Sequence, residues 1–447
     1  MSELSVGLSA IMHRAIGVGT VSALERLSGG ANMESWAFNW EGKSGRNAYV
    51  LRRAPSADYM ADRPFGHVDE AGLVMAAYAN SVKAPEVIAV LNDSDGLGTG
   101  YVMRRIMAEV VPSKILAAPP PFLISDLGRE LARIHALPRE AIPVAIPLME
   151  TSIALSELKA RFLAYGGDRP VIALAVKWCE DHLPTSSSPV LVHGDYRMGN
   201  IMVNSDGLAA VLDWELAHWG DAHDDLAFGC MTVWRFGRLD QPAFGLGSLA
   251  EYFAAYEAAG GIKVDRVRFR FWLVYRTLWW ALGCLQMGQA WRSGADATVE
   301  RVVIGRRTAE QELDLVQLLE EEAPTLERER PVPIIPLNET LALGEPMTGE
   351  IVQAVRDWLE KEIKPQSQGH QKFQVAVALN ALGITMRDLN TKVHAEDKEL
   401  AASLLFGATN LNTPGLLAKL RRSVLDKCAV DSPKYAALEP ASKQWRG

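Results

Sequence analysis

Three side chains near the middle of the sequence have the types and the spacing to do chemistry. Residues 193–200 read His-Gly-Asp-Tyr-Arg-Met-Gly-Asn, and residues 211–215 read Val-Leu-Asp-Trp-Glu. Transfer of a phosphoryl group to a hydroxyl needs a carboxylate that accepts the hydroxyl proton, and oxygen ligands that hold magnesium against the nucleotide phosphates. Asp195 is the predicted base, and Asn200 and Asp213 are the predicted magnesium ligands. Each side chain alone could serve in a turn or a helix cap, but three in register favour a phosphoryl-transfer site.

The segment between these residues must bring them together. Residues 201–212 contain two apolar stretches on either side of an Asn-Ser-Asp-Gly turn, a pattern that predicts a β-hairpin. Because the two strands of a hairpin lie side by side, this hairpin returns Asp213 to the neighbourhood of Asn200.

The motif departs from the protein-kinase pattern at two points. Protein kinases have His-Arg-Asp, four residues, Asn and then Asp-Phe-Gly. Here Gly194 replaces the arginine, and Asp-Trp-Glu at 213–215 replaces Asp-Phe-Gly. Together with the Gly-Asp and Asp-Leu pairs of residues 220–227, these departures resemble the aminoglycoside phosphotransferase-like kinases, and in detail the kinase portion associated with acyl-CoA dehydrogenase family proteins. The resemblance implies ATP and Mg²⁺ as cofactors and an α+β, two-lobed protein-kinase-like fold, with a small β-rich N-lobe and a mostly helical C-lobe.

A nucleotide-binding lobe must then precede the catalytic loop, and its parts are present. Gly29, Gly30 and Ser35 lie in a segment that predicts a hairpin covering the phosphates with backbone N–H groups. The alternating strand 48–53 carries Arg52 where protein kinases carry the lysine that pairs with the phosphates and with a helix glutamate. Because arginine offers a planar fork and lysine a point charge, the phosphate contact is expected to differ in geometry.

Two further elements complete this lobe. A helix is predicted over residues 67–78, and its Glu70 is the candidate partner of Arg52. The alternative role for Glu70 is that of a first-turn acid that complements the helix dipole. A strand over residues 100–106 leads, by the resemblance, into the hinge that meets adenine. The hinge residues implied are Met103, Arg104, Arg105 and Ile106.

Two histidines near the site are interpreted as structural. His135 ends a helix predicted over residues 123–137, where the apolar positions follow one helix face. His193 begins the catalytic loop. We expect both to pack and to brace their surroundings, and neither to carry a proton in the reaction.

Two arginines interrupt an otherwise apolar helix predicted over residues 269–285, namely Arg270 and Arg276. A buried arginine requires a partner. For Arg276 the functional interpretation is a contact with an anionic substrate. The simpler interpretation, for both arginines, is an ion pair with a carboxylate of the same lobe such as Asp221, Asp224 or Asp225.

The composition is that of a folded, soluble enzyme. Of the 447 residues, 48% are hydrophobic and 22% are charged. We find no apolar run of the roughly 18–20 residues that a membrane span needs, and no secretory signal. The four cysteines are scattered, which predicts reduced thiols in a cytoplasmic protein. The net charge of -8, without a basic stripe, makes nucleic acid an unexpected partner.

The predicted organisation has four parts. Residues 1–106 form the nucleotide-binding N-lobe and hinge, and residues 107–325 form the catalytic and substrate-binding C-lobe. A charged and then proline-rich passage at 326–346 reads as a linker. Residues 347–447 form a helical domain of unknown role, whose apolar faces either pack on the lobes or join two chains. We favour a homodimer.

The function that follows is an ATP- and Mg-dependent small-molecule kinase that phosphorylates a hydroxyl. The resemblance implies a hydroxyacyl compound, or its CoA thioester, as the acceptor. Two alternatives stay open. One is a pseudokinase-like regulatory or binding module, which Arg52 in the lysine position supports. The other is a phosphotransferase for an aminoglycoside or another amino alcohol or sugar.

Overall fold

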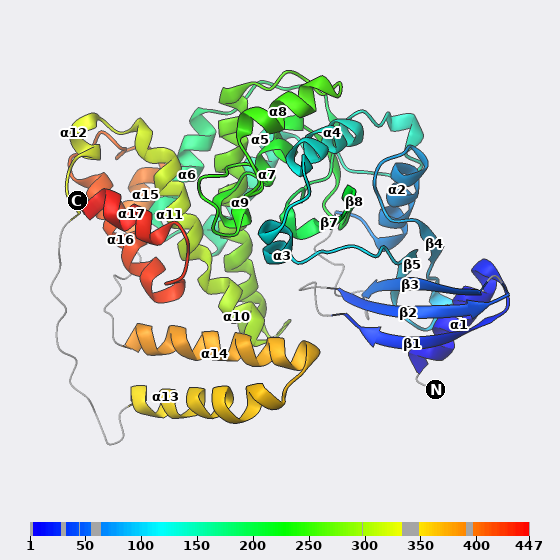
Figure 1. The fold of residues 1–447 in the computed structure, drawn as a ribbon. Coiled ribbons are helices and arrows are strands. Elements are labelled where there is room, and N and C mark those ends of the chain that lie inside the picture. The colour runs from blue at the N-terminus through cyan, green and yellow to red at the C-terminus, as the bar shows by residue number, and fades with distance from the viewer. Residues whose placement is uncertain are drawn as a thin grey trace. The chain divides into compact units, whose positions relative to one another are not determined.

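The computed structural model describes residues 3–27, 33–43, 45–54, 64–296, 298–332, 348–389 and 397–446. The chain divides into two compact units, each assembled from several segments. Unit 1 consists of Met1–Met149, Ser186–Cys230 and Asp240–Phe269, and unit 2 of Glu150–Thr185, Met231–Leu239 and Arg270–Gly447. Figure 1 shows an N-terminal sheet followed by an almost wholly helical remainder, so the predicted α+β class is confirmed.

A five-stranded antiparallel sheet forms the start of unit 1, in the order β1-β2-β3-β5-β4. Helix α1 packs against it, and the buried side chains include Leu8 on the helix and Phe38, Leu51 and Val102 on the sheet. Alternate residues of a strand face opposite sides, so one face of each strand contributes to this core. The elements are α1 (Glu3–Ile16), β1 (Gly19–Arg26), β2 (Glu34–Gly42), β3 (Gly45–Ala54), β4 (Val87–Val90) and β5 (Thr99–Arg104).

Helix α2 (His67–Ala79) packs against β4 and β5 of this sheet. The remaining helices of unit 1 are α3 (Pro112–Ala117), α4 (Leu123–His135), α7 (Ala222–Phe228) and α8 (Leu249–Ala258). The predicted apolar face of α4 is buried and packs against α8, where Gly128 lets the backbone of Tyr252 approach closely. Two short strand pairs complete the unit, β6 (Val190–Val192) with β9 (His218–Gly220) and β7 (Ile201–Asn204) with β8 (Gly207–Val211).

Unit 2 is helical in its described residues. Helix α6 packs against α15, α11 packs against α16, and α14 packs against α10 and α13. Its helices are α5 (Thr151–Ala164), α6 (Pro170–Asp181), most of α9 (Arg266–Ser293), α10 (Val299–Arg306), α11 (Thr308–Leu319), α12 (Thr325–Arg328), α13 (Thr348–Trp358), α14 (Gly369–Leu389), α15 (Lys398–Leu405), α16 (Leu416–Asp431) and α17 (Leu438–Arg446).

The predicted linker does not coincide with the division into units. Helix α12 occupies its beginning, and residues 333–347 lie outside the described part of the chain. The helices after it pack against α6, α10 and α11 within one unit, because their apolar faces need such neighbours. The assignment of a separate domain to residues 347–447 therefore stays a prediction.

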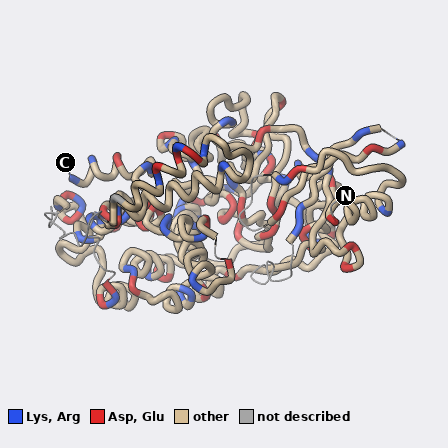
Figure 2. Tube along the Cα trace, turned by 90° about the horizontal axis from the view of Figure 1, so that it is seen from below, with Lys and Arg blue, Asp and Glu red and all other residues tan. Residues whose placement is uncertain are grey.

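Charged residues of both signs occur throughout the described chain. Figure 2 shows acidic and basic residues interleaved along the described trace. All four cysteines are buried and free. Among the described helices, none has the length and apolarity needed to cross a membrane.

Candidate active site

The catalytic loop leaves β6 through Gly194, whose backbone is in the left-handed region with φ of 83°. A Cβ atom at this position would overlap the carbonyl oxygen of Leu216. Both facts require glycine, since side-chain-bearing residues rarely adopt this conformation and none fits the space. The local backbone geometry therefore explains why glycine stands here in place of the protein-kinase arginine.

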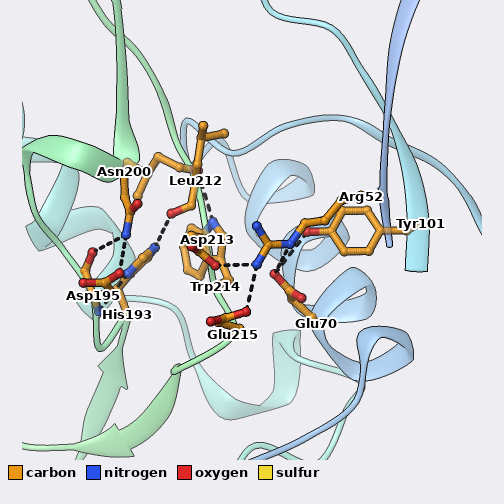
Figure 3. Close-up of polar contacts among 11 residues, drawn as sticks. Arg52, Glu70, Tyr101, His193, Asp195, Asn200, Leu212, Asp213, Trp214 and Glu215 are labelled. Carbon is orange, nitrogen blue, oxygen red and sulfur yellow. Dashed lines mark hydrogen bonds and ion pairs between the residues drawn. The ribbon is translucent and has the colours of Figure 1, made fainter. Parts of the chain in front are cut away.

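Asp195 follows, and its carboxylate is held at both oxygens (Figure 3). Oδ1 accepts a hydrogen bond from Arg197 Nε at 2.7 Å, and Oδ2 accepts one from Asn200 Nδ2 at 2.5 Å. Asn200 Nδ2 also donates to the carbonyl oxygen of Asp195 at 3.0 Å. Burial raises the pKa of Asp195, and the Arg197 guanidinium opposes this rise without cancelling it. Asp195 is therefore a fixed carboxylate and a stronger base than an ordinary aspartate.

His193 braces this loop against the segment that carries Asp213. Its Nδ1 accepts a hydrogen bond from the backbone N–H of Asp195 at 3.2 Å, so the ring proton resides on Nε2, which donates to the Leu212 carbonyl at 3.1 Å. Burial lowers the pKa of His193, and its ring lies 4.7 Å from that of Trp214. The neutral imidazole of His193 holds the loop through these two hydrogen bonds, which agrees with the structural role predicted for this residue.

The β7–β8 hairpin brings Asp213 back to Asn200, which confirms the prediction made from the Asn-Ser-Asp-Gly turn. Ile201 pairs with Val211, and the next backbone N–H, that of Leu212, donates to the Asn200 carbonyl at 2.7 Å. Asp213 itself has φ of 68°. A non-glycine residue in this region is strained, and such residues cluster at functional sites.

Arg52 connects β3 to this site through three carboxylates. Its Nε lies 3.6 Å from Glu70 Oε1, and its Nη2 donates to Asp213 Oδ1 at 2.5 Å and to Glu215 Oε2 at 2.9 Å. Burial would raise the pKa of Asp213, but the charges of Arg52 and Arg197 and the hydrogen bond from Arg52 together hold that pKa below its ordinary value. The predicted pair of Arg52 and Glu70 is in contact, with Tyr101 OH donating to Glu70 at 3.1 Å. The role of Glu215 was not predicted, although it lies on the same short segment as Asp213.

Asp225 holds the start of the catalytic loop through hydrogen bonds to its backbone. It accepts hydrogen bonds from the backbone N–H groups of His193 at 2.6 Å and Gly194 at 2.9 Å. His135 lies beside it, with Nε2 3.2 Å from Asp225 Oδ2 and Nδ1 2.8 Å from Tyr256 OH. Burial would raise the pKa of Asp225, and the hydrogen bond with His135 contributes most to holding it below its ordinary value instead. His135 is structural, as predicted, and it acts through Asp225.

Arg270 of α9 pairs with another carboxylate than those that the sequence suggested. Arg270 lies 3.0 Å from Glu322 Oε1, donates to the Leu318 carbonyl at 3.1 Å, and lies over the Trp178 ring. The expected ion pair of Arg270 with a carboxylate of the same predicted lobe is present, but its partner is Glu322, in the turn after α11, and not one of the aspartates of segment 221–225. Asp221 pairs instead with Arg268 and His223.

Arg276 is buried in unit 2, with its guanidinium 5.3 Å from the centre of the Trp279 ring. Its role toward a substrate stays a prediction.

The family model for the phosphotransferase enzyme family matches residues 23–268, more than half of the chain. The chain belongs to this family. It is a phosphotransferase that acts on hydroxyl groups, and it has the kinase-like fold of those enzymes.

Two curated proteins are similar to this phosphotransferase. The chain is 26% identical to mouse (Mus musculus) acyl-CoA dehydrogenase family member 10 over 248 residues, which cover 49% of this chain and 22% of that protein. It is 21% identical to the probable acyl-CoA dehydrogenase IBR3 of Arabidopsis thaliana, over 79% of this chain and 46% of that protein. The chain thus spans less than half the length of both curated relatives.

A solved structure with the same fold is a candidate aminoglycoside phosphotransferase from Ralstonia eutropha. The TM-score is 0.55 at 21% identity, and the match covers 71% of this chain and 98% of that chain. This likeness supports the fold of the phosphotransferase and carries nothing about its acceptor.

The predicted nucleotide-lobe residues are only partly described. Ser35 lies on β2 directly opposite Arg52 in the β2–β3 register, while Gly29 and Gly30 lie outside the described residues. Met103 pairs with Val50 on β3. At the end of β5, Arg104 forms an ion pair of 2.5 Å with Glu86, the backbone N–H of Arg105 donates to Ala48 O at 3.0 Å, and Ile106 follows half-buried.

Asn200 and Asp213 have the donor chemistry that magnesium prefers. The Asn200 amide nitrogen is committed to Asp195, which leaves its oxygen Oδ1 for another partner. Asp213 gives one carboxylate oxygen to Arg52 and is 26% exposed. Among the described residues no cluster of three His, Cys, Asp or Glu could hold a metal alone. Magnesium is usually bound by one or two carboxylates together with substrate phosphates, so this pair fits magnesium that arrives with a nucleotide.

Proposed function

We propose that this phosphotransferase uses ATP and Mg²⁺ to phosphorylate a hydroxyl of a small molecule, with Asp195 as the base. The observation that carries the proposal is the hairpin contact that sets Asn200 and Asp213 beside each other while Asn200 also fixes Asp195. Asn200 belongs to the proposed metal-binding pair and also holds the carboxylate of the proposed base. The distance between the base and the metal ligands is therefore fixed. Phosphoryl transfer depends mainly on such positioning.

Asp195 accepts the proton of the acceptor hydroxyl. Its pKa, raised by burial, makes it a better acceptor than a surface aspartate, and Arg197 and Asn200 fix the direction of its carboxylate. Bound magnesium would supply positive charge that neutralises the charge developing on the phosphate oxygens. Asn200 and Asp213 are the proposed protein ligands.

Arg52 has two proposed roles. It keeps Asp213 anionic and oriented, as its contact and the lowered pKa of Asp213 support. It also offers the remaining edge of its guanidinium to a phosphate. Gly29, Gly30, Ser35 and the hinge residues Met103–Ile106 remain the proposed surroundings of the nucleotide.

The proposed acceptor is a hydroxyacyl compound or its CoA thioester. The support is the similarity to two proteins named as acyl-CoA dehydrogenases, which act on acyl groups. Phosphorylation would turn a poor hydroxide leaving group into one that can be eliminated. Arg276 is the proposed contact for an anionic end of this acceptor, and Arg276→Ala is expected to raise its KM.

The acceptor and the chemistry are tested together by substrate-dependent ADP release. Hydroxyacids, hydroxyacyl-CoAs, sugars, choline-like alcohols and aminoglycosides are compared with Mg-ATP. With the best acceptor, Asp195→Asn is expected to lower kcat by about 10²–10⁴-fold, the range of general-base catalysis. The matched control is Asp206→Asn, which changes an exposed carboxylate at the tip of the same hairpin.

Each outcome separates one part of the proposal. An Asp195→Asn enzyme with the wild-type rate would refute the assigned base. Turnover of sugars or aminoglycosides with inert hydroxyacyl compounds would refute the acceptor and leave the kinase standing. Failure to bind ATP, with or without Mg²⁺, would favour the pseudokinase alternative that Arg52 suggested.

A further inference from the structure

Unit 2 contains a cavity of about 630 Å³ that no residue of the candidate active site lines. Helices α10, α11, α13 and α14 contribute to its wall, together with residues 232–237 and the segment after α16. A cavity of this size accommodates a small organic molecule.

Cations outnumber acids on its wall. The cationic lining residues are Arg307, Arg356, Lys364, Arg387 and Lys434, and the acidic ones are Glu310, Glu360 and Asp431.

The acids are already engaged. Glu310 pairs with Arg307 at 3.0 Å and accepts from Ser432 Oγ at 2.8 Å. Asp431 pairs at 2.5 Å with Arg306, a cation that is not among the lining residues. The positive charge of the wall is thus only partly compensated from within.

Arg387 and Arg356 carry guanidinium nitrogens that lack partners. Arg387 Nε donates to the Val430 carbonyl at 2.6 Å, but its buried Nη2 has no hydrogen-bond acceptor in the described chain. The buried Nε of Arg356 likewise has none there, and its nearest carboxylate, that of Glu360, is 3.9 Å from Nη2. A buried donor without an acceptor is costly.

Burial lowers the pKa of the Arg387 guanidinium, and the like charges of Arg356 and Arg306 lower it further against the opposing effect of Asp431. Like charges that crowd together in this way are stabilised by an anion between them.

The wall also contains apolar residues. It includes Val233, Phe236, Val303 and Leu379. Phe236 is 44% exposed although its ring is large and apolar, and its backbone is strained with φ of 48°. A strained backbone at an exposed aromatic residue is the kind of cost that a binding site retains.

We propose that this cavity binds a small organic oxyanion, with a carboxylate or phosphate head on Arg356 and Arg387 and an apolar body against Phe236 and Leu379. Arginine is suited to both heads, because its planar fork matches either group. The proposal gives a ligand site to the C-terminal helices and does not depend on the proposed function.

Octanoate and octyl phosphate supply the two kinds of head on one apolar body, and 1-octanol supplies the body alone. Titration calorimetry on the full chain measures each, with and without saturating Mg-ATP. We expect one site per chain for at least one anion, unaffected by Mg-ATP and at least tenfold weaker for 1-octanol. Arg387→Gln and Arg356→Gln are each expected to weaken anion binding at least tenfold.

The matched control is Arg330→Gln, an arginine of the same unit that pairs with Glu327 and does not line the cavity. It should bind like the wild type. Because Arg387→Gln also removes the bond to Val430, Lys434→Gln, an exposed lining residue, provides a variant that will fold and should weaken binding about threefold.

The proposal would be overturned by the absence of binding for both anions, by equal binding of 1-octanol, or by wild-type affinity in folded Arg356→Gln. Displacement of the anion by Mg-ATP would also overturn it, because it would move the anion to the nucleotide site.

Discussion

The candidate active site and the cavity of unit 2 handle buried charge in opposite ways. In the active site, acids outnumber cations, and both guanidiniums form ion pairs with carboxylates. In the cavity, cations outnumber acids, and two guanidiniums retain unused donors. The active-site charges are Glu70, Asp195, Asp213 and Glu215 against Arg52 and Arg197.

The difference predicts what each site takes up. An excess of carboxylates is relieved by a cation, and a metal ion supplies the most charge in the least volume. An excess of guanidiniums is relieved by an anion. The sign of the uncompensated charge, and not the size of the opening, thus separates a site for metal and nucleotide from a site for an organic anion.

The largest effect is expected from removing one negative charge of the active site. Asp213→Asn should lower kcat by about 10²–10³-fold, since an electrostatic contact made in the transition state is lost. It should also abolish the tightening of ATP binding by Mg²⁺ in calorimetric titrations. If Mg²⁺ tightened ATP binding to the variant as it does to the wild type, Asp213 would not be a metal ligand.

The hydrogen bonds of Asp225 to the catalytic loop should contribute strongly to the free energy of unfolding. Asp225→Ala leaves the N–H groups of His193 and Gly194 and the ring of His135 without their shared acceptor. We expect the free energy of unfolding to fall by about 3 kcal/mol, measured by urea denaturation. The exposed Asp240→Ala serves as the control, and an equal loss in both variants would contradict the assigned role.

A smaller effect is expected where charge is kept and shape is changed. Arg52→Lys preserves the cation, but an ammonium cannot reach all three carboxylates as the guanidinium does. The KM for ATP should rise about tenfold, which corresponds to one charge-assisted hydrogen bond of about 1.5 kcal/mol. Arg53→Lys, the next residue on β3, pairs with Glu34 instead and is the matched control. A similar change in both variants would argue against a special role for Arg52.

The smallest predicted effect is a shift in pH dependence. Arg197 lowers the pKa of Asp195 against the effect of burial, so Arg197→Gln should raise that pKa further. Because the base must be ionised, the acid limb of the kcat profile should then move to higher pH. Arg139→Gln, whose guanidinium lies over the Trp219 ring, provides the control. If the acid limb did not move, Arg197 would have no effect on the pKa of the base.

The sequence was sufficient where the chain itself imposes proximity. The hairpin between Asn200 and Asp213 is local, so spacing and turn residues predicted it. The ion pair of Arg52 with Glu70 could be proposed from residue type and from position along the predicted strand and helix, because the kinase fold brings these two positions together. The resemblance, and not periodicity, supplied that fold.

Contacts between distant segments were missed for a physical reason. Asp225 belongs to the Asp-Leu pair that contributed to the resemblance, but its use as an acceptor for two backbone N–H groups leaves no pattern in residue types. The ion pair of Arg270 was predicted, but the aspartates named as its partners were wrong, because many carboxylates could have satisfied it and only the packing of α9 selects Glu322. Gly29 and Gly30 lie outside the described residues and stay a prediction.

The backbone of Gly194 limits how this catalytic loop can be exchanged with that of another kinase. Its positive φ and the nearby Leu216 carbonyl leave no room for a side chain, so installing the protein-kinase arginine by one codon change would first have to displace the chain on the far side of the loop. The two loop types are therefore separated by a barrier of several coordinated substitutions. An engineered exchange of the two loop types therefore requires replacement of the whole segment from Gly194 to Leu216.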